Sequence, residues 1–170
     1  MPSVSPSDPR LAPATEDEIP LVVEIIREAF GPVAQRLGIL EEDVPRYAAF
    51  ESVPRMTMWM AEHEVTMFLL WDGEEAVGCG GCSADKDDPT RGHLNRIAVR
   101  PGCQGKGYGK AVVIGLEDEL RKRGLVGVTL AHVSPDPPLH AFYEGLGYRT
   151  IGVEPSTLWG VELTFMEKDL

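Results

Sequence analysis

The spacing of hydrophobic residues changes near residue 65, and this change separates a helical first region from a region where strands and helices alternate. In the first region, apolar residues recur at helical spacing from Thr15 to about Ala29, and Thr15 with Glu18 forms a capping-box pattern. We expect this helix to end at Gly31-Pro32, because proline removes a backbone donor and clashes with the preceding turn. A short strand over 11–14 is expected before the helix.

The stretch from 41 to 64 contains Pro45 and Pro54, which break the helical pattern. It predicts two short helices, the second beginning near Val53. From residue 65 onward the pattern predicts strands, with an Asp72-Gly73 hairpin turn after the first. The expected elements are strands 65–71, 76–84 and 93–99, helix 107–123, strand 127–133, helix 138–146, and strands 148–153 and 158–168.

A strand, a crossover helix and the next strand pair most simply as parallel neighbours with a right-handed connection. The fold class predicted is therefore α/β, with a mixed, mostly antiparallel central sheet and flanking helices. The length of 170 residues suits a single domain over 1–170, with a loose Ser- and Pro-rich leader over about 1–10.

The formal net charge of -11 disfavours nucleic acid and anionic membrane surfaces as partners, because both are normally bound by clustered Lys and Arg. No apolar run approaches the length of a membrane span, and residues 1–8 lack a secretory signal pattern. A cytoplasmic location is expected. Cys79, Cys82 and Cys103 are expected to be free thiols, and no metal site is expected, because positions 79 and 82 face opposite sides of a strand.

The segment 104–110 follows a predicted strand and opens a predicted helix, and it is rich in glycine and lysine. Glycines allow a tight turn whose N–H groups point at an anion, and the helix dipole adds partial positive charge. Lys106 and Lys110, with Arg100 nearby, are expected to form a basic patch. The segment fits neither a Walker A loop nor a dinucleotide fingerprint, because the required glycine spacings are missing.

Gln104-Gly105-Lys106-Gly107-Tyr108-Gly109 resembles the Q/R-x-x-G-x-G/A acetyl-CoA motif of the GNAT superfamily of N-acetyltransferases. The lead-in 96–101 resembles the fourth strand of that family, and Phe142 to Tyr148 resembles its F/L-Y-e-k-l-G-F/Y segment. The resemblance implies a bulge in the fourth strand that splays it from the fifth, and acetyl-CoA as co-substrate. It implies acetyl transfer to a primary amine of a small molecule or a protein by direct attack. A non-catalytic acyl-CoA-binding sensor is the alternative, and a homodimer is left open.

The resemblance also implies a cofactor site. The pantetheine arm would pair with the backbone of Ile97, Ala98 and Val99, and the Val99 N–H would polarise the thioester carbonyl. The pyrophosphate would lie on backbone amides of the glycine-rich turn, contributed by Gln104, Gly105, Lys106, Gly107, Tyr108, Gly109 and Lys110.

Two catalytic residues are expected on the same basis. Tyr143 matches the tyrosine of the family segment and would protonate the leaving thiolate. His93 lies six residues before Val99, where family members often carry a catalytic glutamate, and imidazole is suited to take the amine proton. The rival bases are Asp87, Asp88 and His132.

Substrate choice is expected to depend on residues 31–64 and on the loop around Trp159. Tyr47, Phe50 and Trp59 either line a cleft there or pack in the core. Family members often place an asparagine where this chain has Asp136, so a contact from that position to CoA is left open.

Overall fold

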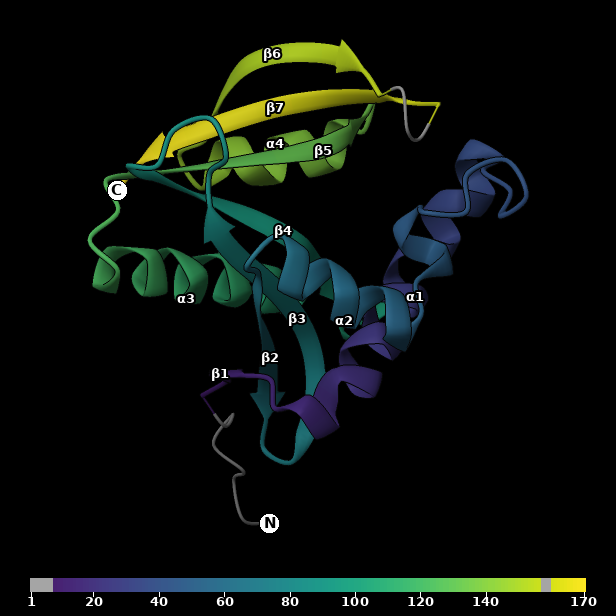
Figure 1. The fold of residues 1–170 in the computed structure, drawn as a ribbon, viewed down its shortest axis with the longest axis horizontal. Coiled ribbons are helices and arrows are strands. Elements are labelled where there is room, and N and C mark those ends of the chain that lie inside the picture. Colours follow the sequence, from purple (N-terminus) through teal and green to yellow (C-terminus); the bar gives the residue numbers. More distant parts are fainter. Residues whose placement is uncertain (1–7, 157–159) are drawn as a thin grey trace.

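The computed structural model describes residues 8–156 and 160–170, which form a seven-stranded mixed sheet with helices on both faces (Figure 1). The strand order is β1-β2-β3-β4-β5-β7-β6, and β4–β5 is the one parallel pair within it. The predicted α/β class with a mixed, mostly antiparallel sheet is therefore confirmed. The strands are β1 Arg10–Pro13, β2 Thr66–Asp72, β3 Glu75–Ala84, β4 Arg91–Val99, β5 Gly127–Ser134, β6 Arg149–Pro155 and β7 Glu162–Asp169.

Four α-helices cover the two faces of the sheet: α1 Ile19–Leu37, α2 Val53–Glu62, α3 Tyr108–Lys122 and α4 Pro137–Gly145. The side chains that alternate along β2 show which helices cover which face of the sheet. Met67 and Leu69 pack in one cluster with residues of α1 and α2, whereas Phe68 and Leu70 pack in another with residues of α3 and α4. Because side chains of a strand point alternately to opposite faces, α1 and α2 cover one face and α3 and α4 the other.

The prediction that Gly31-Pro32 ends the first helix is wrong, because α1 continues to Leu37 and ends at Gly38 with a left-handed φ of 66°. Beyond the proline, Ala34 is buried in a third cluster, so packing there offsets the lost hydrogen bond. The first of the two short helices predicted over 41–64 is only a 3₁₀ turn, Ala48–Phe50.

The other element predictions agree with the structure to within about two residues wherever both ends are described. Glu18 accepts a hydrogen bond from the Thr15 N–H at 2.9 Å, as the capping box requires. The last predicted strand begins later than expected, at Glu162. The segment 157–159, with Trp159 and its loop, lies outside the described residues, as does the leader up to residue 7.

Strands β4 and β5 run together for only three residues and then part. They pair at Arg91 with Gly127, Gly92 with Val128 and His93 with Thr129. Beyond these pairs β5 stays with β7 up to Ser134, while β4 stays with β3 up to Val99, and the two ribbons diverge in Figure 1. The splayed strands expected from the resemblance are thus present.

Cys79 and Cys82 are buried free thiols that belong to the clusters on opposite faces of the sheet. Burial raises the pKa of Cys79 to about 12, so it is an unreactive thiol at neutral pH. Across residues 8–156 and 160–170, none of the helices is long and apolar enough to cross a membrane.

Candidate active site

A β-bulge in β4 turns the side chains of two consecutive residues, Asn95 and Arg96, toward the same face of the sheet. The register between β3 and β4 shifts opposite residues 96 and 97, and Arg96 takes a left-handed φ of 51°. His93 and Asn95 line a cavity with residues of α2, and Arg96, which strict alternation would send to the other face, also faces α2. Ile97 then packs on the α3 face. The extra residue of the bulge has shifted the alternation by one.

The edge of β4 that faces away from β3 ends beside the glycine-rich turn. The Arg100 N–H donates to the Val77 carbonyl of β3 at 2.9 Å. Since successive residues of an antiparallel strand point their polar groups to opposite edges, the N–H and C=O of Val99 face the side where β5 has left. The Gln104 amide reaches the Val99 carbonyl there at 3.4 Å.

The glycine-rich turn has the backbone geometry that its glycines were expected to allow. Gly105 and Gly107 have φ values of 79° and 83°, and open space surrounds the Cβ position of both. The first bond into α3 runs from the Ala111 N–H to the Gly107 carbonyl at 3.1 Å, so earlier N–H groups have no acceptor inside the helix. Lys106 and Lys110 are exposed beside this helix start.

Arg100 does not join this basic patch, contrary to the sequence prediction. Its guanidinium ion-pairs with Glu24 at 2.9 Å and Glu28 at 2.8 Å, both on α1, and donates to the Ala76 carbonyl. The patch therefore consists of Lys106 and Lys110.

The side chain of Tyr108, the first residue of α3, is engaged with the β2–β3 hairpin. Its hydroxyl donates to the carboxylate of Asp72 at the end of β2, which fixes the start of the helix against the β2–β3 hairpin. This hydrogen bond is the main reason that the pKa of Tyr108 is raised to about 12. The hydroxyl of Tyr108 is thus used by a contact within the fold.

Tyr143 lies on α4 and is 6% exposed, stacked on His132 with ring centroids 6.0 Å apart. Burial raises its pKa, so the hydroxyl stays protonated at neutral pH. The preceding residue, Phe142, comes within 3.4 Å of the Cβ position of Gly109 in the first turn of α3. The structure thus brings the tyrosine segment and the glycine-rich turn together.

His93 lines a cavity of about 460 Å³ together with its proposed rivals Asp87 and Asp88. Its Nδ1 is 2.8 Å from the hydroxyl of Thr129, and that hydroxyl donates to Asp85. Because the single hydroxyl proton is committed to Asp85, Nδ1 must carry the proton of neutral His93, and Nε2 keeps its lone pair.

The pKa of His93 is lowered from the ordinary 6.5, because burial disfavours the charged ring more than the Asp85 carboxylate 3.9 Å away favours it. Neutral His93 with a basic Nε2 can accept a proton at physiological pH. Sequence reasoning missed Asp85 and Thr129, because their contact with His93 depends on the pairing of β4 with β5 and on the loop before β4.

The remaining rival base, His132, and the possible CoA contact, Asp136, both occupy structural positions. His132 is 6% exposed, its Nδ1 donates to the Val133 carbonyl at 2.9 Å, and its Nε2 is 3.2 Å from Nδ1 of His140. Both ring nitrogens are therefore engaged. Asp136 caps α4 by accepting from the Leu139 N–H at 3.2 Å and ion-pairs with Arg36.

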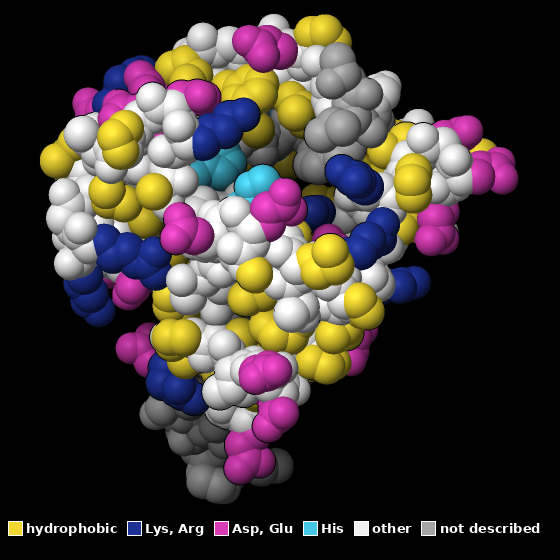
Figure 2. All heavy atoms as spheres, viewed as in Figure 1, with side chains coloured by type: hydrophobic (Ala, Val, Ile, Leu, Met, Phe, Trp, Pro, Cys, Tyr) yellow, Lys and Arg dark blue, Asp and Glu magenta, His cyan; other side chains and the backbone are white. Residues whose placement is uncertain are grey.

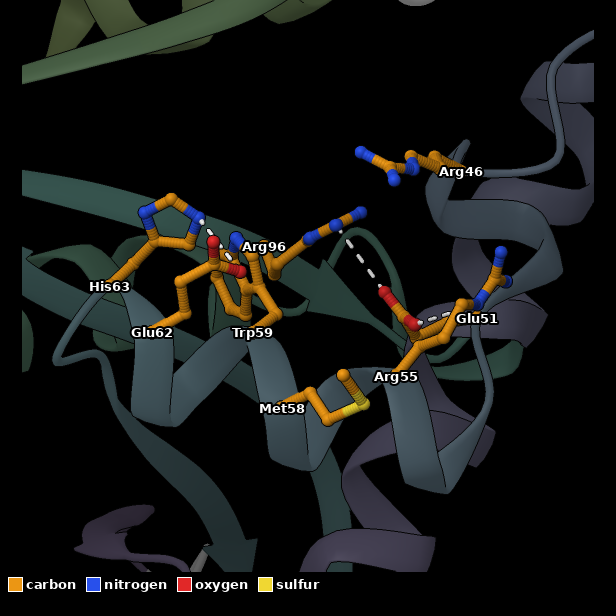
Figure 3. Close-up of a pocket in the computed structure, with 8 residues that line it drawn as sticks. All are labelled: Arg46, Glu51, Arg55, Met58, Trp59, Glu62, His63 and Arg96. Carbon is orange, nitrogen blue, oxygen red and sulfur yellow. Dashed lines mark ion pairs between the residues drawn. The ribbon is translucent and has the colours of Figure 1, made fainter.

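A second, smaller cavity of about 200 Å³ lies against α2 and adjoins the first, since Trp59 and His63 line both (Figure 3). Of the aromatics singled out from the sequence, Tyr47 is fully buried and Trp59 lines the cavities. Figure 2 shows Lys, Arg and His side chains around a hollow on this face. Arg96 and the buried Glu51 were not singled out as cavity residues, because the resemblance implied a bulge but not that it turns Arg96 toward α2, and because Glu51 reaches Arg96 from a distant segment. In the part of the chain that the structure describes, no group of three or more His, Cys, Asp or Glu could hold a metal ion.

Comparisons with known proteins agree with this geometry. Residues 23–148 match the profile of the acetyltransferase (GNAT) family. A search of curated proteins found no match. Among solved structures, the chain is similar to the ribosomal-protein-S18-alanine N-acetyltransferase of Escherichia coli, with 19% identity and a TM-score of 0.72, over 95% of this chain and 94% of that one.

Two further solved structures share the fold. An acetyltransferase of Thermus thermophilus has 19% identity and a TM-score of 0.75, over 98% of this chain and 100% of that one. The PaiA N-acetyltransferase of Thermoplasma acidophilum, solved in complex with coenzyme A, has 15% identity and a TM-score of 0.75, over 96% of this chain and 99% of that one.

Proposed function

The chain belongs to the acetyltransferase (GNAT) family, and we propose that it transfers an acetyl group from acetyl-CoA to a primary amine of a small molecule or a protein. One observation carries the proposal: β4 parts from β5 after His93, and the edge that this exposes leads directly to the glycine-rich turn at the start of α3. An extended thioester arm needs such an edge, and its phosphates need such a turn.

The residues present suit acetyl-CoA in two ways. The open space around Gly105 and Gly107 leaves the N–H groups of the turn accessible, with Lys106 and Lys110 beside them to offset the negative charge of the chain. The Ile97–Val99 segment offers backbone groups toward the side that β5 leaves. Bound there, acetyl-CoA supplies an acyl group activated as a thioester, and the Val99 N–H stabilises negative charge that develops on the carbonyl oxygen.

His93 and Tyr143 divide the proton transfers in this proposal. His93 accepts the proton of the amine on Nε2, directly or through water, while Thr129 and Asp85 hold its ring in the required tautomer. Tyr143 donates its proton to the leaving sulfur, and its raised pKa keeps that proton in place beforehand. The remaining contribution is positioning of the amine against the carbonyl carbon.

The test combines binding and turnover. Acetyl-CoA should raise the melting temperature of the protein while ATP and NAD do little, because preferential binding stabilises the native state. A panel of primary amines should then release free thiol from acetyl-CoA, with the acetylated amine identified by its mass. Thermal stabilisation without thiol release from any amine would favour the acyl-CoA-binding sensor. Stabilisation by ATP but not by acetyl-CoA would refute both.

A further inference from the structure

The smaller cavity contains a buried arginine whose hydrogen-bonding capacity is only partly used. The side chain of Arg96 is 13% exposed, its Nη2 lies 3.3 Å from the Glu51 carboxylate, and the guanidinium lies 5.0 Å from the ring centroid of Trp59. Its Nη1 is buried without a hydrogen-bond partner among the described residues. A buried N–H group without an acceptor is costly, so an acceptor that reaches this guanidinium from the cavity that Arg96 lines is favoured.

The charges around Arg96 leave a positive excess. The single carboxylate of Glu51 serves Arg96 and also Arg55, whose Nε lies 3.7 Å away. The rest of the Arg55 guanidinium donates to the carbonyls of Pro45 and Phe50, which gives it a structural role. Two arginines therefore share one negative charge.

A third arginine adds to this excess. Arg46 is exposed, and its guanidinium points toward that of Arg96 across the cavity in Figure 3. Within the described ranges no ion pair is recorded for Arg46. The remaining carboxylate of the lining, Glu62, lies 3.9 Å from His63 at the other side of the cavity. Arg46 and Arg96 thus present positive charge to one small volume in a chain of net charge -11.

The adjoining larger cavity has the opposite character. Asp85, Asp87 and Asp88 line it around His93. Its basic lining residues are Lys86 and Arg91. Arg91 makes no hydrogen bond through its Nη1, but it ion-pairs with three carboxylates, those of Asp169 at 2.7 Å, Glu167 at 3.5 Å and Asp88 at 3.7 Å. The larger cavity therefore favours an ammonium group, and the smaller cavity favours an anion. Because Trp59 and His63 line both cavities, the two binding sites would be adjacent.

We propose that the acceptor is a small primary amine that also carries a carboxylate. The carboxylate binds Arg96 and Arg46 in the smaller cavity, and the amine faces His93 and the aspartates of the larger one. Arginine suits this role because its planar guanidinium binds carboxylates through paired, charge-assisted hydrogen bonds. A volume of about 200 Å³ is below the roughly 300–1,000 Å³ of pockets for drug-sized ligands, which fits a small charged group. This inference rests on the proposed acetyl transfer.

The experiment compares amines that differ at one group. Linear ω-amino carboxylates and L-α-amino acids are each paired with the carboxamide, with the amine lacking the carboxylate and with the aminophosphonate. We expect kcat/KM to be about ten- to a hundredfold higher for the carboxylate than for its carboxamide, the scale of hydrogen bonds to charged groups. The aminophosphonate distinguishes a preference for carboxylate from a preference for any anion.

Arg46→Gln and Arg96→Lys should each lower the carboxylate-to-carboxamide ratio about tenfold, the first by removing a charge and the second by removing the planar fork. Arg10→Gln is the matched control, because Arg10 is exposed on β1 and lines neither cavity. It should keep the wild-type ratio. Arg46 is exposed, so its variant tests the proposal even if Arg96→Lys folds poorly.

A binding measurement separates this inference from the proposed function. Calorimetry of the amino carboxylates with the acetyl-CoA-free protein needs no turnover, and binding that Arg46→Gln weakens supports the anion site even if no amine is acetylated. Preferential turnover of neutral or purely cationic amines overturns the inference but keeps the acetyltransferase. Equal binding of carboxylate and carboxamide overturns it as well, as does a ratio that Arg46→Gln and Arg96→Lys leave unchanged.

Discussion

Replacing Gly107 with asparagine tests the glycine-rich turn, and Gly124→Asn supplies a matched control at the other end of the same helix. Gly107 has a φ of 83° and Gly124 a φ of 79°, and open space surrounds the Cβ position of both. Each variant therefore carries a similar backbone cost of about 1 kcal/mol, since asparagine tolerates the left-handed region better than most residues. For a chain of this size, that cost lowers the melting temperature by about 2–4 °C.

The two variants should differ in their response to acetyl-CoA. At a concentration of about 100 Kd the wild type gains about 2.7 kcal/mol, a rise of roughly 5–11 °C. A side chain at Gly107 occupies the space in front of the turn, and a tenfold loss of affinity would leave about half of that gain.

The assay is a thermal melt of all three proteins with and without acetyl-CoA. Gly124→Asn should keep the full ligand-induced rise. A full rise in Gly107→Asn would show that the anion binds elsewhere, and an equal loss in both variants would assign the effect to strain.

Other predictions address the proton transfers and the core. Tyr143→Phe should lower kcat by about a hundredfold, the lower end for a general acid, while the melting-temperature rise with acetyl-CoA persists, because the ring still packs on His132. The rate should fall as the pH drops through an apparent pKa below 6.5, because protonated His93 cannot accept a proton; in a pH–rate profile of kcat/KM, His93→Gln should remove this limb. The lowered pKa also means that stability is lost as the pH falls below 6.5, and a wild-type pH dependence of unfolding retained in His93→Gln would contradict this. Lys168→Met should destabilise the protein by about 1–3 kcal/mol in denaturant unfolding, because it removes the ion pair that reaches the buried Glu117 at 3.0 Å; an unchanged midpoint would show that this pair contributes nothing.

The sequence by itself determined the elements whose signals are local. The apolar run over 65–71, followed by the Asp72-Gly73 turn, predicts a strand, and the structure has β2 there at Thr66–Asp72. The glycines of the turn at 104–110 were equally readable, because a positive φ at Gly105 and Gly107 favours the residue without a side chain.

Tertiary structure alone decided the features that depend on contacts between distant segments. Helix α1 continues past Pro32 because Ala34 packs in a buried cluster. Arg100 forms ion pairs with carboxylates of α1 and therefore does not contribute to the basic patch at the glycine-rich turn. The hydrogen bonds that set the His93 tautomer come from Thr129 on a neighbouring strand and Asp85 in the preceding loop.

The bulge in β4 is the decisive case for the candidate site. One extra residue opposite β3 reverses the alternation and turns Arg96 toward α2, into the cavity that adjoins the one lined by His93. A sequence pattern of period two cannot show this reversal, because it follows from the register between two strands and not from the residues of either one.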